Sequence, residues 1–152
     1  MDPGLSGLAD SEKELLFKGP LLVCILLAGA DGKIDNKEIN GAVQTARQQH
    51  WVKSSLSGFF QEVATDFEDK LKILIQAYPV EARKRNQLIT EELGALNKIW
   101  HRLDKNFAAA YYEMLKYLAH KIASSSGKFW AKITHEEAQL AELPMISNPS
   151  KI

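Results

Sequence analysis

The residues best suited to chemistry lie in one short stretch, residues 31–38, which reads DGKIDNKE. In an alignment with an EF-hand calcium loop, Asp31, Asp35 and Glu38 take ligand positions, and Gly32 takes the position of the sharp-turn glycine. Calcium is bound by roughly six to eight oxygens, and the first two acidic positions of the loop hold no acid here. The stretch therefore predicts weak binding of a divalent cation whose identity stays open.

Helix capping explains the same residues and is the stronger interpretation. Gly32 can adopt a positive φ after a helix end, and Asp35 and Glu38 have the spacing of a capping box for the next helix. The two interpretations are compatible, because a capping carboxylate keeps lone pairs that a cation could use.

Other chemistry is not supported by the spacing of the reactive residues. The four histidines are scattered and match neither a zinc-protease nor a di-iron pattern, and Cys24 lies inside an apolar run, where a thiol is inert. We therefore predict no catalytic residue and a non-enzymatic protein. An enzyme with a pocket lined by Trp100, Tyr111 and Tyr112 is a weaker alternative, because aromatic residues at helical spacing usually form a core.

Composition limits the class of protein. The 152 residues suit one domain, and 19 basic residues balance 19 acidic ones, which argues against a nucleic-acid partner. A single cysteine fits a reducing compartment. The apolar run over residues 21–30 is too short to span a bilayer. We expect a soluble, cytoplasmic protein without direct membrane insertion.

The elements that must position the stretch are helices, because apolar residues recur at helical spacing and no segment alternates as a strand does. We expect an all-α bundle of about seven or eight helices, with a break or kink at Gly19-Pro20. The expected helices cover residues 11–18, 20–29, 35–51, 56–64, 65–78, 80–104, 107–122 and 134–143.

A faint internal repeat suggests two related helix–loop–helix units. Residues 28–34 read AGADGKI and residues 123–129 read ASSSGKF, and each segment follows an apolar helix and precedes a capped one. In the second unit, Glu136 or Glu137 is the only equivalent of Glu38, which makes these two glutamates weaker candidates for a metal ligand.

An apolar helix that ends in AGADGKIDNKE, residues 28–38, resembles the TerB family of tellurite-resistance-like helical domains. The resemblance implies a compact helical fold, and we expect one TerB-like domain over residues 1–146 with a frayed tail over residues 147–152. It also implies an acidic surface suspected of binding a divalent metal, and a role in tellurite resistance or stress response. The chain departs from the family in its second loop, where serines precede Gly127 and residues 128–132 form an insertion.

Two further groups are candidates for contact with a protein partner. Arg83, Lys84 and Arg85 form a basic cluster, which is either a solvated face paired with nearby acids or a contact for an acidic partner, and Phe129 and Trp130 are large aromatics in a loop. We expect an interaction module with an unidentified protein partner and leave homo-oligomerisation open. The alternatives are a dedicated calcium or other metal-ion sensor and a co-chaperone-type adaptor domain.

Overall fold

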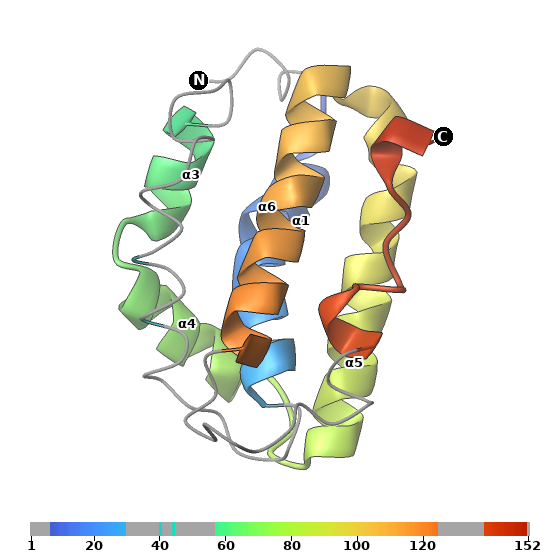
Figure 1. Ribbon diagram of the computed structural model, residues 1–152. Coiled ribbons are helices and arrows are strands. Elements are labelled where there is room, and N and C mark those ends of the chain that lie inside the picture. The colour runs from blue at the N-terminus through green and yellow to red at the C-terminus, as the bar shows by residue number, and fades with distance from the viewer. Residues whose placement is uncertain (1–6, 30–39, 41–43, 45–56, 125–138, 152) are drawn as a thin grey trace.

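All of the main elements in the computed structural model of the chain are helices (Figure 1). The structure describes residues 7–29, 40, 44, 57–124 and 139–151. The prediction of an all-α fold is confirmed, because the described residues contain no strand. The count of seven or eight helices stays a prediction, since most of the expected helix at 35–51 and half of that at 134–143 fall outside the described residues. The elements are α1 (Asp10–Ala28), α3 (Ser57–Ala64), α4 (Phe67–Gln76), α5 (Ala82–Gly94) and α6 (Lys105–Ser124), with the short 3-10 turns η3 (Ala95–Lys98), η4 (Trp100–Arg102) and η5 (Pro149–Lys151).

The core lies where α1 packs against α6. Every residue from Gly19 to Ala28 is buried, which accounts for an apolar run without a polar face. The predicted stripe of α6 is buried along its whole length: Phe107, Tyr111, Met114, Leu118 and Ile122. α5 ends at Gly94 and the chain continues as η3 and η4. The apolar stripe expected for one helix here is nevertheless buried at all five positions: Ile89, Leu93, Leu96, Trp100 and Leu103.

The two central helices run parallel. Arg102, just before α6, pairs with Glu12 near the start of α1 at 2.8 Å. Tyr111, nearly two turns into α6, donates a hydrogen bond to the carbonyl of Leu16 of α1 at 2.7 Å. Both helices then run toward the same end of the molecule (Figure 1). Their last described residues, Gly29 after α1 and Ser124 of α6, consequently lie at that end, which we call the loop end.

α1 does not stop at Gly19-Pro20 but continues through both residues. Pro20 has no N–H, so the carbonyl of Leu16, four residues earlier, lacks its usual helical donor. The hydroxyl of Tyr111 donates to this carbonyl at 2.7 Å. Gly19 makes the approach feasible, because a Cβ at that position would lie 2.0 Å from the Tyr111 oxygen. A side chain from α6 thus completes the hydrogen bonding of α1.

The N-terminus of α1 lies at Asp10, one residue before the expected start of the helix at residue 11. The helix begins after Ala9, whose backbone N–H donates to the carboxylate of Glu12 at 2.8 Å. The same carboxylate oxygen accepts a hydrogen bond from Arg102 at 2.8 Å. The side chain of Ala9 has no acceptor, so only the glutamate half of a capping box is present.

This arrangement predicts a pH dependence of stability that is carried by Glu12. The N–H of Ala9, and after it Arg102, hold the pKa of the Glu12 carboxyl below its ordinary value. A carboxyl with a lowered folded-state pKa stabilises the fold above its unfolded pKa, near 4.3, and loses that contribution as the pH falls through the folded value. We expect Glu12→Gln to melt below the wild type at about pH 7 and to approach it at roughly pH 3. An equal difference in melting temperature at both pH values would contradict this assignment.

Candidate functional site

The loop end is organised around one buried cation, Arg85 of α5, whose side chain is 4% exposed. Its Nη2 donates to the carbonyl of Gly29 at 2.9 Å, and its Nη1 donates to the carbonyl of Val80 at 3.3 Å. Gly29 caps the C-terminus of α1, where the helix dipole favours a positive charge. Arg85 therefore fixes the last described residue before the DGKIDNKE stretch to the start of α5.

The electrostatics of Arg85 are unusual for so buried a cation. Burial lowers the pKa of Arg85, but a guanidinium stays protonated at neutral pH. Among the described residues its Nε finds no hydrogen-bond partner, and the two acceptors it does have are neutral carbonyls. The loop end thus carries a positive charge that no described carboxylate neutralises.

The rest of the predicted basic cluster is exposed. Arg83 and Lys84 lie on the solvent side of the first turns of α5, and Lys84 approaches Glu81 at 3.8 Å, as the solvated-face interpretation expects. Arg85 does not share that face. The cluster is contiguous in sequence but divided in space, with one member in the interior and two in water.

The other predicted site residues lie outside the described residues: Asp31, Asp35, Glu38, Phe129, Trp130, Glu136 and Glu137. Within the part of the chain that the structure describes, no group of three or more His, Cys, Asp or Glu side chains is arranged to hold a metal ion. The described residues contribute the base from which the two loop segments start, at Gly29 and at Ser124.

Sequence reasoning missed a polar link between three helical segments. Glu92 of α5 accepts a hydrogen bond from Lys18 of α1 at 3.0 Å and another from the hydroxyl of Tyr78, just after α4. Burial raises the pKa of Tyr78, so its phenol stays protonated. Beside the link lies a cavity of about 300 Å³, lined in part by Ser11 and Glu14. No local pattern signals this link, because its members come from distant positions in the sequence.

A second cavity, of about 380 Å³, opens beside the N-terminus of α4. Its acidic lining consists of Asp66, Glu68 and Asp69, and Asn40 donates to Glu68 at 2.7 Å. Asp66 adopts a left-handed conformation with φ of 54°. The charge of this cavity is negative, but the carboxylates are not arranged as a metal site.

The remaining reactive residues are part of the core or lie at its edge. Cys24 is fully buried, and burial raises its pKa, so the thiolate needed for nucleophilic chemistry is disfavoured. Trp100 and Tyr111 pack edge to face in the core with ring centroids 5.9 Å apart. Tyr112 is half-buried beside Lys116.

These features define an all-helical protein with a parallel central helix pair and a cationic base beneath its loop end. No described helix is both long enough and apolar enough to cross a membrane. Comparison with protein-family models, with curated proteins and with solved structures finds no match.

Proposed function

We propose that the chain is a non-enzymatic, TerB-like interaction module associated with tellurite resistance or stress response. In this proposal its loop end binds a divalent cation weakly through Asp31, Asp35 and Glu38. Glu136 or Glu137 adds a weaker ligand from the second unit, so that the two pseudo-repeated helix–loop–helix units act together.

The observation that carries the proposal is the parallel arrangement of α1 and α6. Asp31 follows Gly29 by two residues, which limits the separation of their Cα atoms to about 7 Å. Glu137 precedes Gln139 by two residues and is limited in the same way. Gln139 starts the described segment that is bound to the last turns of α6 through Glu142. Asp31 and Glu137, one acid from each unit, are therefore tethered to one end of the bundle.

The charge of Arg85 supports weak rather than tight binding. Its guanidinium bonds to Gly29, so Asp31 is tethered close to a positive charge. That charge attracts loop carboxylates and repels a divalent cation. A cation would compete with Arg85 for the same carboxylates, and its affinity would be lower than that of a loop with no built-in cation.

Titration of the isotope-labelled chain with calcium, magnesium, zinc and manganese, followed by backbone amide NMR, tests the proposal. We expect saturable changes centred on residues 29–38, with a dissociation constant on the order of 0.1–1 mM. Asp31→Ala should abolish them. Glu113→Ala, which removes an exposed carboxylate from α6, should retain them.

If no saturable change occurs at an ion concentration about ten times that dissociation constant, residues 31–38 only cap a helix and do not bind a cation. A dye that reports exposed apolar surface separates the module from a dedicated sensor. A sensor exposes such surface when the ion binds, whereas the proposed module does not.

The proposed module also contacts a protein partner. Arg83 and Lys84 are exposed at the start of α5 and supply a positive face for an acidic partner. Phe129 and Trp130 are the proposed apolar contacts. A co-chaperone-type adaptor would use the same residues, so the partner itself must be identified by capture with the full chain.

A further inference from the structure

The C-terminal segment, residues 139–151, is bound to the helical body in the manner of a ligand, and we call it the strap. It leaves the loop end, passes alongside α6 and the turns after α5, and ends in η5 (Figure 1). Three apolar side chains of the strap are buried in the core, Leu143 with 0% exposure and Ala141 and Ile146 with 3% each. Leu140 and Met145 are half-buried and pack against the core, and most of the other residues of the strap are exposed.

The body holds the strap mainly by its backbone. Asn97 donates to the carbonyl of Met145 at 3.0 Å and accepts from the N–H of Ser147 at 2.7 Å. Trp100 donates through its indole nitrogen to the carbonyl of Ser147 at 2.9 Å. Ser147, the first residue of the tail expected to be frayed, is therefore bonded twice through its backbone. Recognition of this kind does not depend on the side chains of the bound segment.

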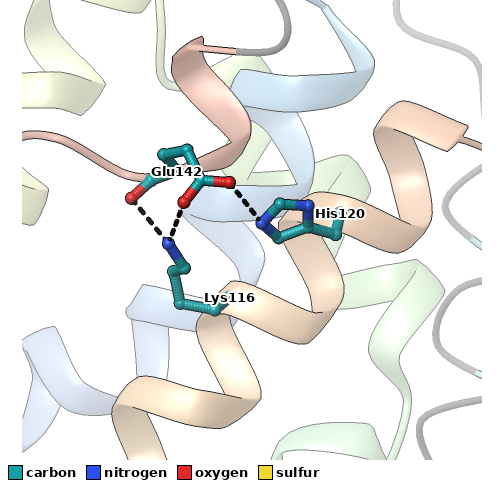
Figure 2. Close-up of polar contacts among 3 residues, drawn as sticks. All are labelled: Lys116, His120 and Glu142. Carbon is teal, nitrogen blue, oxygen red and sulfur yellow. Dashed lines mark hydrogen bonds and ion pairs between the residues drawn. The ribbon is translucent and has the colours of Figure 1, made fainter.

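One side chain of the strap is recognised by charge. The carboxylate of Glu142 lies 2.7 Å from Nζ of Lys116 and 2.9 Å from Nε2 of His120, both on α6 (Figure 2). Lys116 also donates to the backbone carbonyl of Glu142 at 3.1 Å. Lys116 and His120 thus fit an acidic residue, and the buried side chains of the strap place leucine directly after it and isoleucine three residues later.

The strap is not bound without cost. Leu143 adopts a positive φ of 50°, a left-handed conformation that is strained for a residue with a branched side chain. Burial of its side chain and the bonds on either side hold it there. This strain opposes binding of the strap, so the strap is held less tightly than its contacts alone would hold it.

We propose that the surface formed by Asn97, Trp100, Lys116 and His120 is a peptide-binding site that the strap occupies in cis. Its ligand in trans is a segment of a partner protein with an acidic residue, leucine directly after it and an apolar residue three positions further. The strap lowers the apparent affinity for that segment by the fraction of molecules in which the site is vacant.

A fluorescently labelled peptide with the sequence of residues 139–151 tests this proposal by polarisation against the full chain. The wild type should bind it weakly, since its own strap competes. Ile146→Ala weakens the strap in cis and should raise the apparent affinity at least tenfold. Glu142→Gln, a milder change at an exposed position, should act in the same direction if Ile146→Ala unfolds the chain.

The site itself is tested in the strap-weakened background. Adding Asn97→Ala removes both backbone bonds and should reduce peptide affinity about tenfold, whereas adding Gln87→Ala, an exposed position on α5, should not. Failure of a folded strap-weakened chain to bind the peptide would overturn the proposal, as would binding that is indifferent to Asn97. Dimerisation in light scattering without peptide binding would also overturn it, because the surface would then serve strap exchange between copies.

Discussion

Tyr111→Phe is expected to destabilise the protein by about 1–3 kcal/mol, the usual cost of leaving one buried polar group without a partner. The change removes one oxygen and leaves the ring in place among Phe59, Trp100 and Phe107. The change removes the hydrogen bond from the Tyr111 hydroxyl to the carbonyl of Leu16. Pro20 cannot replace this bond, because proline has no N–H to donate. Equilibrium unfolding in urea, monitored by circular dichroism, measures the loss.

The cause can be isolated by restoring the missing donor. Pro20→Ala places an N–H where the Leu16 carbonyl can accept it, so Tyr111→Phe should cost much less in a Pro20→Ala background than in the wild type. The double-mutant cycle yields the coupling between the two positions. Tyr112→Phe, a half-buried neighbour on α6, serves as the matched control and should change stability little. Equal losses in both backgrounds would show that the Tyr111 hydroxyl does not replace the proline N–H.

Arg85→Met is the second change with a large expected effect, again a loss of about 1–3 kcal/mol. Methionine fills a similar volume but leaves the buried carbonyl of Gly29 without the donor that Arg85 provides at 2.9 Å. The stability of Arg85→Lys should lie between that of Arg85→Met and that of the wild type. Lysine retains the charge but cannot bond both Gly29 and Val80 in the same geometry. Unfolding measurements on the three proteins establish this order.

Arg83→Met is the matched control, since it removes an exposed arginine from the same turn and should leave stability almost unchanged. Amide hydrogen exchange adds a local measurement, because Arg85→Met should accelerate exchange in the last turn of α1 more than in its first. A stability equal to that of the wild type would mean that methionine packing offsets both lost bonds, as happens for some buried charges. Unchanged hydrogen exchange in the last turn of α1 as well would show that the anchoring role of Arg85 is wrong.

Much of the fold follows from local sequence patterns. The stripes of α6 and of the segment from Ile89 to Leu103 are buried as predicted, because helical spacing of apolar residues depends only on near neighbours. α3 is found within the expected range of residues 56–64. The sequence predicts one helix over residues 80–104, whereas α5 ends at Gly94. The pattern does not signal this end, because the apolar stripe continues through η3 and η4 without a change of period.

Two other points at which the structure differs from the predictions have one physical cause. In each, a residue distant in sequence forms a hydrogen bond to a backbone carbonyl that its own segment leaves without a donor. Gly19-Pro20 reads as a break when only α1 is considered, and Tyr111 removes the reason for the break from the other end of the chain. Arg85 reads as part of a solvated basic face until the carbonyl of Gly29 is placed beside it. Of the candidate site, the acidic stretch could be named from sequence. Its cationic base and the strap could not, because they require the packing of α5 and α6.

The bond between Leu16 and Tyr111 joins residues 95 positions apart, and the Glu12–Arg102 pair spans 90. During synthesis on the ribosome, α1 with its apolar run therefore emerges long before α6, the helix that covers it. Until then, the buried face from Gly19 to Ala28 has only partial cover. Such a topology favours folding of the core only once α6 has been synthesised, and until then the nascent chain exposes an apolar segment of the kind that chaperones bind.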